Sequence, residues 1–129
     1  MGYRVLLLLS TPLFTLLPLA GHAQQGDANA GATVFRKCAT CHVADTDQNK
    51  VGPSLNGVFG RQAGTHPDFA YSAAMKDAGT GGLVWDEATL RDYLHNPKSK
   101  IKGTKMAFVG LKNDKEIIDL MAYLKQFSK

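Results

Sequence analysis

The chain has few cysteines, one tryptophan, no internal repeats and little net charge, and the last two features limit the kinds of protein it can be. Among 129 residues there are two cysteines and one tryptophan, and the formal net charge is only +4 at pH 7. So small a charge does not by itself indicate nucleic-acid binding. Without repeats, low-complexity tracts or linkers, the length allows one compact domain rather than two.

A long apolar run is also missing, except near the N-terminus in MGYRVLLLLSTPLFTLLPLAGHAQ. This run covers about residues 5–19 and is interrupted by Pro12 and Pro18. A transmembrane helix needs about 20 apolar residues, whereas a shorter run followed by small residues is typical of a secretory signal. We therefore predict a cleaved signal at 1–23 and an exported, periplasmic domain at 24–129. The alternative is a protein tethered to the membrane by an uncleaved N-terminal segment.

Helical periodicity predicts four helices, and no segment has the pattern of a convincing strand. Apolar residues recur at helical spacing, and capping residues and prolines mark the ends. The predicted helices run from Asp27 into the cysteines, from Tyr71 to the glycines at 79–82, from Asp86 to Asn96, and from Asn113, with Glu116 placed for a capping box, to about Leu124. Between them lie irregular stretches at 43–70 and 96–112, which are uncommon in a compact domain unless they serve a function. We predict a small, loop-rich, all-α fold whose loops wrap a flat cofactor.

Both cysteines lie in the segment CATCH, where a histidine follows the second cysteine directly. In a helical turn, Cys38, Cys41 and His42 stand at i, i+3 and i+4 and so share one face. There, two thiols can bind the vinyl-derived carbons of a haem while the imidazole reaches the iron. C-x-x-C-H is the recognised pattern for covalent haem attachment.

Other interpretations of the two cysteines are weaker. A thioredoxin-like redox pair is expected near a βαβ pattern, which is missing here. A structural zinc site needs four ligands, and His66 and His95 have no paired spacing. A disulfide between Cys38 and Cys41 would close too small a loop to stabilise much, although export to an oxidising compartment keeps this alternative open.

Beyond CATCH, the segments VGPSLNGVFGRQAG, FAYS, LVWDEATLRDYLHNPK, GTKMAF and DLMAYLK cover most of the domain. In these segments the chain, from about Asp27 to its end, resembles class I cytochromes c, close to the mitochondrial protein and to the short bacterial cytochrome c2. The resemblance implies an all-α class I cytochrome c fold with three to five helices wrapped around one haem c. It implies that this haem is attached covalently through Cys38 and Cys41, and that the protein is an electron carrier rather than an enzyme.

The resemblance also implies that His42 and Met106 ligate the iron, and that the carbonyl of Pro53 accepts a hydrogen bond from the second ring nitrogen of His42. Of the four methionines, Met106 lies in an irregular loop. Because thioethers more often pack in cores, the residues alone leave Met75 open as the ligand. A soft thioether ligand favours ferrous iron and so raises the reduction potential.

Further roles near the haem follow from the resemblance alone. They are binding of the haem propionates (Arg61, Tyr71 and Trp85), approach of a hydroxyl to the ligand sulfur (Tyr93), hydroxyl hydrogen bonds (Ser72 and Thr104) and screening of the haem edge (Phe108). For the aromatic residues, plain burial is the alternative. The terminal helices are expected to cross at Gly31, Phe35, Leu120 and Tyr123, where a small glycine admits a large aromatic ring.

The chain also departs from the family pattern. Met75 stands where the family commonly has an asparagine that helps to order a buried water beside the haem. Lys100 and Lys102 replace a usual aromatic and a proline in the loop before Met106, which predicts a more mobile loop.

No acidic residue lies between Asp92 and Asp114, although several lysines do. Such a charge run usually marks a solvated face. The resemblance implies instead that a ring of lysines surrounds the exposed haem edge and steers it toward acidic patches on membrane redox complexes. These lysines are Lys37, Lys50, Lys98, Lys105 and Lys112.

The function predicted from these patterns is a soluble, monomeric one-electron carrier. It would shuttle electrons between a quinol–cytochrome c reductase and a terminal oxidase or photosynthetic reaction centre, without a nucleic-acid partner. One rival is a small haem peroxidase or gas sensor in which Met106 is displaced. The other is a redox protein of the same chemistry held at the membrane by its leader.

Overall fold

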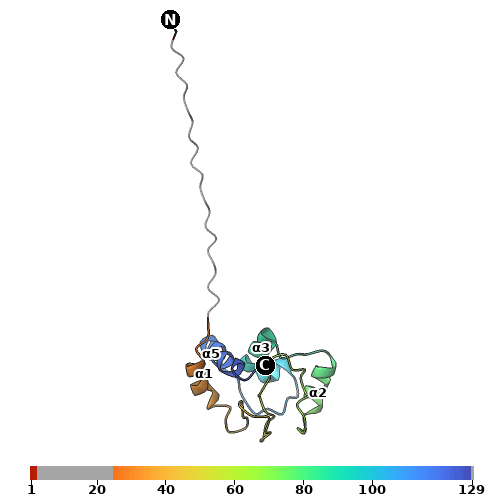
Figure 1. The fold of residues 1–129 in the computed structure, drawn as a ribbon. Coiled ribbons are helices and arrows are strands. Elements are labelled where there is room, and N and C mark those ends of the chain that lie inside the picture. The colour runs from red at the N-terminus through yellow and green to blue at the C-terminus, as the bar shows by residue number, and fades with distance from the viewer. Residues whose placement is uncertain (3–24, 129) are drawn as a thin grey trace.

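The computed structural model describes residues 1–2 and 25–128, so the predicted signal segment lies almost entirely outside the described residues. The described part contains five helices, arranged as Figure 1 shows. They are α1 (Ala28–Phe35), α2 (Ala73–Thr80), α3 (Glu87–His95), α4 (Pro97–Lys100) and α5 (Asp114–Lys125). Within this part, strand-like pairing is limited to one isolated antiparallel bridge between Gln62 and Val84. The prediction of a small, loop-rich, all-α fold is therefore confirmed.

The two terminal helices, α1 and α5, pack directly against each other, and they lie side by side in Figure 1. Gly31 makes this close approach possible, because a Cβ atom placed there would lie 2.0 Å from the carbonyl oxygen of Asp119. The ring of Phe35 packs against that of Tyr123 at a centroid distance of 5.2 Å, and Leu120 is fully buried. The expected crossing of the terminal helices is thus present.

A buried carboxylate fastens the start of α1 to α5. One oxygen of Asp119 accepts a hydrogen bond from the backbone N–H of Asp27, at 2.8 Å. Both of its oxygens accept from Lys115 Nζ, also at 2.8 Å. These hydrogen bonds favour the charged form, so they hold the pKa of Asp119 below its ordinary value. Since Asp27 caps α1 with its own side chain, one carboxylate positions the first turn of the fold.

The structure corrects two of the predicted boundaries. Helix α1 ends at Phe35 instead of continuing into the cysteines, because the next three backbone N–H groups, at 36–38, donate to carbonyls three rather than four residues back, as in Cys38 N–H to Phe35 O at 2.7 Å. The stretch after Asn96, predicted to be irregular, begins with the short helix α4. Its start is favoured because the Asn96 side chain accepts from Ser99 N–H at 3.2 Å and Pro97 occupies the first helical position.

The remaining helices begin and end close to their predicted positions. Asp86 caps α3 by accepting from Thr89 N–H, and Asn113 caps α5 by accepting from Lys115 N–H. The apolar faces of α3 and α5 supply seven of the fifteen buried hydrophobic residues of the core, and Ile117 and Leu120 are among the most buried. None of the described helices is long and apolar enough to span a membrane.

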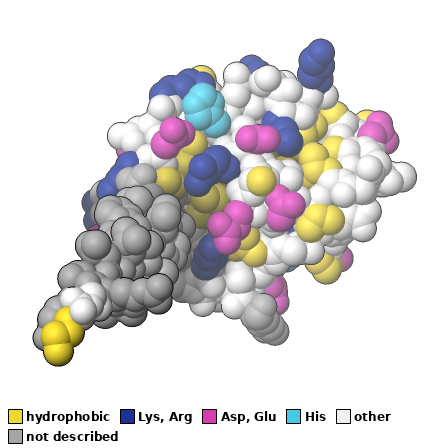
Figure 2. Space-filling view, turned by 90° about the horizontal axis from the view of Figure 1, so that it is seen from above, with side chains coloured by type: hydrophobic (Ala, Val, Ile, Leu, Met, Phe, Trp, Pro, Cys, Tyr) yellow, Lys and Arg dark blue, Asp and Glu magenta, His cyan; other side chains and the backbone are white. Residues whose placement is uncertain are grey.

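The surface seen in Figure 2, which views the molecule from above Figure 1, carries lysine, arginine, aspartate and glutamate side chains interspersed with one another. The long irregular segments lie along the opposite, lower edge of the ribbon in Figure 1. Those segments carry the predicted site.

We predict that Gly31→Ala destabilises the holoprotein by about 1–3 kcal/mol or more, because an added methyl forces α1 and α5 apart. The free energy of unfolding in urea measures this change. Gly81→Ala is the matched control: at the end of α2 the nearest contact of an added Cβ is 3.3 Å away, so the loss should stay below about 1 kcal/mol. Equal losses in the two variants would contradict the tight crossing.

Candidate haem-binding site

The CATCH segment forms a single turn directly after α1. The carbonyl of Cys38 accepts hydrogen bonds from the backbone N–H groups of Cys41, at 3.0 Å, and His42, at 2.9 Å. One turn therefore holds two thiols and an imidazole together, as the spacing predicts. Both thiols are free and half-buried. Burial raises the pKa of Cys38 to about 11, so its thiol stays protonated at neutral pH.

The orientation of the His42 ring is fixed by the loop that follows CATCH. Its Nδ1 lies 2.7 Å from the carbonyl oxygen of Pro53. Because a carbonyl only accepts, Nδ1 carries the proton and the lone pair of Nε2 is left for a metal. Burial lowers the pKa of His42, which keeps the imidazole neutral and able to act as a ligand.

Gly52 completes the seat of this imidazole. A Cβ atom at Gly52 would lie 2.3 Å from Cε1 of the His42 ring, so no side chain fits there. The N–H of Gly52 donates to the carbonyl of Cys41 at 2.8 Å, which ties the loop back to the CATCH turn. The sequence alone did not single out Gly52, although it lies in the segment VGPS beside Pro53.

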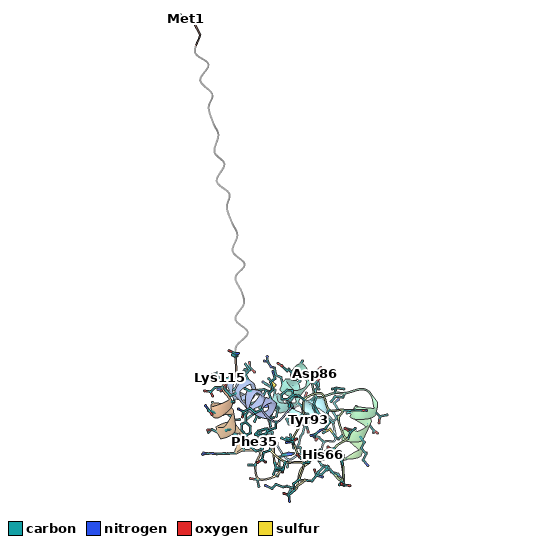
Figure 3. All side chains as sticks on the ribbon, in the orientation of Figure 1. Met1, Phe35, His66, Asp86, Tyr93 and Lys115 are labelled. Atoms are coloured by element: carbon teal, nitrogen blue, oxygen red, sulfur yellow. The ribbon has the colours of Figure 1, made fainter. Side chains whose placement is uncertain are left out.

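The half-buried Met106 lies in the loop between α4 and α5, and one hydroxyl contacts its sulfur while a second binds its backbone. The Tyr93 hydroxyl lies 3.9 Å from Met106 Sδ and 2.9 Å from Thr104 Oγ1, which in turn accepts from Met106 N–H at 3.3 Å. Burial raises the pKa of Tyr93, so its hydroxyl keeps the proton that it donates. The ring of Tyr93, labelled in Figure 3, packs against that of Trp85 at a centroid distance of 4.9 Å.

The three residues expected at the propionates are neighbours: the Arg61 and Tyr71 side chains interact with each other, and the backbone N–H of Trp85 donates to the Arg61 carbonyl at 2.9 Å. Arg61 is oriented by protein carbonyls: it donates to Ser54 O at 2.8 Å and to Asn56 O. The Tyr71 oxygen accepts from the backbone N–H of His66 at 3.2 Å, so its own proton is left for an acceptor.

Arg61 also faces an open polar cavity of about 380 Å³. The cavity is lined by Asp47, Asn49, Asn56, Gly57, Arg61, His66, Pro67 and Asp68. Trp85 is buried. Ser72 has a structural role, because its hydroxyl oxygen accepts from Met75 N–H and caps α2.

Asn49 is a residue of this region that sequence reasoning missed. Its side-chain oxygen accepts from Ser54 N–H at 3.0 Å, and its amide donates to the carbonyl of Pro67 at 2.9 Å. It therefore clamps the loop that carries Pro53 to the loop that lines the cavity. A single asparagine in a long irregular stretch carries no sequence pattern that would reveal this contact.

Three of the five predicted docking lysines are engaged within the protein. Lys37 pairs with Glu116 at 2.8 Å, so the Glu116 carboxylate does not complete the predicted capping box at the start of α5. Lys50 Nζ donates to the carbonyl of Ala39 in the CATCH turn at 2.5 Å.

Lys112 donates to the carbonyl of His95 at the end of α3, at 3.0 Å, where a cation also suits the helix dipole. Lys98 and Lys105 are exposed, and within the described part of the chain neither forms an ion pair. These two carry the least compensated positive charge of the predicted set.

The donors present suit a covalently bound haem. Two free thiols and an imidazole with an available Nε2 stand in one turn, a glycine leaves room for the ring, and a thioether with a hydroxyl partner is held in a second loop. Imidazole and thioether are ligands that iron accepts in haem proteins.

Comparison with known proteins gives concordant results. The profile of the cytochrome c family matches residues 28–128. The chain is 55% identical to cytochrome c2 of Rhodoplanes tepidamans over 102 residues, which cover 78% of this chain and 92% of that protein. It is 52% identical to cytochrome c-550 of Bradyrhizobium diazoefficiens over 103 residues, covering 79% and 74%. The structure of cytochrome c2 from Rhodospirillum centenum superposes with a TM-score of 0.76 at 43% identity, covering 81% of this chain and all of that one.

We predict that Gly52→Ala displaces the His42 ring, because the new methyl would overlap Cε1. The expected loss of unfolding free energy is about 1–3 kcal/mol, together with an altered visible spectrum of the holoprotein. Val51→Ala, at the exposed neighbouring position, should change neither quantity. A wild-type spectrum and stability in Gly52→Ala would show that the imidazole has more room than the structure indicates.

Proposed function

The chain belongs to the cytochrome c family, and we propose that it carries single electrons between membrane redox complexes through a haem whose iron is ligated by His42 and Met106. As a member of this family it is an electron-transfer protein rather than an enzyme, and it binds haem c covalently through Cys38 and Cys41. When bound, the haem supplies a one-electron iron couple.

The observation that carries this proposal is that groups of the protein itself orient both donors. His42 is oriented by the Pro53 carbonyl, and the Met106 sulfur lies beside the Tyr93 hydroxyl. Donors held in place do not need to rearrange when the charge of the iron changes, which suits rapid electron transfer. If His42 and Met106 both ligate the iron, no coordination site would be left for oxygen or peroxide, which disfavours the peroxidase or gas-sensor alternative.

The other residues have supporting roles in this proposal. Tyr93 and Thr104 position the sulfur, Arg61, Tyr71 and Trp85 bind the propionates, and Phe108 screens the haem edge. The half-buried setting of His42 and Met106 would disfavour the more positive ferric state and so raise the potential.

The proposal also covers export and partners. We expect residues 1–23 to be removed and the domain 24–129 to act as a monomer in the periplasm. Its lysines would meet acidic patches on a quinol–cytochrome c reductase and on a terminal oxidase or reaction centre. The acid-free segment between Asp92 and Asp114, with Lys98 and Lys105 unpaired within the described residues, supports this interaction.

Replacing the sulfur ligand tests the proposal. We predict that Met106→Ala abolishes the weak red charge-transfer band of the oxidised protein and lowers the midpoint potential by more than about 60 mV, a tenfold change in a one-electron equilibrium. A visible spectrum and a redox titration measure both effects.

Met121→Leu is the matched control, because Met121 is buried in the α5 face of the core. It should leave spectrum and potential unchanged at a stability loss below about 1.5 kcal/mol. An unchanged spectrum in Met106→Ala would refute the ligand assignment. Binding of carbon monoxide by the native ferrous protein would favour the peroxidase or sensor alternative.

A second prediction concerns steering. Lys98→Gln and Lys105→Gln should each lower the second-order rate of electron transfer with a quinol–cytochrome c reductase at low salt and flatten its salt dependence, because steering by exposed charges is screened within about 10 Å at 0.1 M salt. Stopped-flow kinetics at several ionic strengths measure this rate.

Lys125→Gln is the matched control, since Lys125 pairs with Glu87 and lies over the ring of Phe59. Salt-independent kinetics in the wild-type protein would show that Lys98 and Lys105 do not steer a partner and are simply solvated surface residues.

A further inference from the structure

The last turn of α3 contacts the Met106 loop (residues 100–112) at both ends and in the middle. Four consecutive residues of the helix make one contact each. These contacts are Asp92 with Lys100 Nζ at 2.9 Å, the Tyr93 hydroxyl with Met106 Sδ at 3.9 Å, Leu94 O with Leu111 N–H at 2.8 Å, and His95 O with Lys112 Nζ at 3.0 Å. One helical turn therefore restrains the whole segment that carries the proposed sulfur ligand.

The C-terminal end of the loop is held by main-chain contacts. Leu111 is buried, and its N–H is bonded to a carbonyl of α3. Gly110 lies so close to the helix that an added Cβ would be 2.2 Å from His95 O. Breaking a buried main-chain hydrogen bond leaves both of its groups without a partner, which is costly. We therefore expect this end to stay attached to α3.

The N-terminal end depends on helix α4, which has four residues and is too short to be stable alone. Its contacts with neighbouring segments must therefore hold it. Pro97 and Ile101 contribute buried apolar surface. The Lys100 and Asp92 side chains, by contrast, keep 31% and 62% of their surface exposed. Of the four contacts with the last turn of α3, this pair alone joins opposite charges, and salt screens an exposed ion pair.

We propose that the Lys100–Asp92 ion pair is a salt-sensitive latch that keeps the Met106 loop closed and so limits the access of other ligands to the iron. The inference rests on the proposed function, because it takes Met106 as an iron ligand. Lys100 and Asp92 touch neither the iron nor its ligands, so they are positioning residues that act through the loop.

Opening of the loop is expected to be local. When the ion pair separates, α4 loses one of its contacts with α3, and the backbone between Ile101 and Met106 gains freedom. The crossing of α1 and α5 does not involve these residues and can stay intact. Local openings of this kind need less free energy than global unfolding, so they are populated in the native protein. A small uncharged ligand could then enter the position that the sulfur leaves.

The departure from the family pattern at Lys100 gives the loop this sensitivity to salt. An aromatic residue, which the family usually has there, would hold the loop by apolar contact, which moderate salt does not screen. A lysine holds it by charge, and its attraction to Asp92 falls as the ionic strength rises. The latch is therefore a feature of this chain's own residues.

The test uses the full-length ferric holoprotein and added imidazole at about pH 8, where imidazole is mostly uncharged. Imidazole binds when Met106 leaves the iron, so its apparent Kd reports the population of the open loop. We expect Lys100→Gln to lower this Kd about twofold to fivefold at low salt, the factor that corresponds to one exposed ion pair. Added salt should lower the wild-type Kd toward that of the variant and leave the variant unchanged. Lys100→Arg should restore the wild-type value.

Lys125→Gln is the matched control, because it removes another exposed ion pair of α3, with Glu87 in the first turn of the helix. That pair stays closed when the Met106 loop opens, so the Kd of imidazole should not change. Amide hydrogen exchange provides a second measurement. The N–H of Met106, which donates to Thr104 Oγ1, should exchange faster in Lys100→Gln and at the wild-type rate in Lys125→Gln.

The outcomes that contradict the latch differ from those that contradict the proposed function. A wild-type Kd in Lys100→Gln, an equal change in Lys125→Gln, or a salt dependence that persists in Lys100→Gln would overturn the latch and leave the proposed function standing. If Met106→Ala binds imidazole no more tightly than the wild-type protein, the sulfur is not a ligand and the proposed ligation fails. Exchange of the Met106 N–H then decides by itself whether the ion pair holds the loop.

Discussion

The crossing of α1 and α5 at Gly31 is the constraint on which the rest of this small fold depends. Helix α1 leads directly into the CATCH turn, and α5 follows directly after the loop that carries Met106. Packing these two helices backbone to backbone therefore fixes one end of each segment that carries a proposed ligand. The buried Asp119, which accepts from Asp27 N–H and pairs with Lys115, also holds the two helices together at this crossing. Gly31 and Asp119 thus fix the positions of the two helices that adjoin the CATCH turn and the Met106 loop.

Polar contacts then orient the donors with little help from the core. Pro53 O fixes the tautomer of His42, Asn49 clamps the Pro53 loop to the segment at Pro67, and Lys50 is bonded to the CATCH turn. Each uses a main-chain carbonyl as the acceptor, so long irregular loops obtain the hydrogen bonds that regular structure would otherwise supply. The loops can therefore be ordered without forming strands.

The sequence was sufficient to predict those features of the fold and site that depend on periodicity and on local motifs. The caps at Asp27, Asp86 and Asn113 and the grouping of Cys38 and His42 were predictable, because each follows from neighbours within four residues. The early end of α1, the helix α4 and the partners of the lysines were not. These depend on hydrogen-bond geometry or on contacts across many positions, such as Lys37 with Glu116, for which the sequence offers no period. The roles at the haem came from family resemblance, not from spacing.

The loop before Met106 is ordered by contacts of its own, although it lacks two residues that the family usually has there. Its departures from the family pattern at Lys100 and Lys102 predict mobility, yet Lys100 pairs with Asp92 on α3 at 2.9 Å and Ile101 beside it is buried. Gly103, at a φ of +88°, brings the loop against α2, where an added Cβ would lie 3.2 Å from the Ala74 side chain. The N-terminal end of the loop is therefore fixed to α2 and α3.

The far end of the same loop is fixed as well, by Leu111 N–H bonded to Leu94 O. Between these anchors the Tyr93 hydroxyl contacts the Met106 sulfur, and the Thr104 hydroxyl accepts from the Met106 backbone N–H. If Met106 is the ligand proposed above, these anchors and hydroxyls would keep its sulfur in place through a change of charge without requiring the whole loop to be rigid. A one-electron carrier would need that property from a thioether ligand.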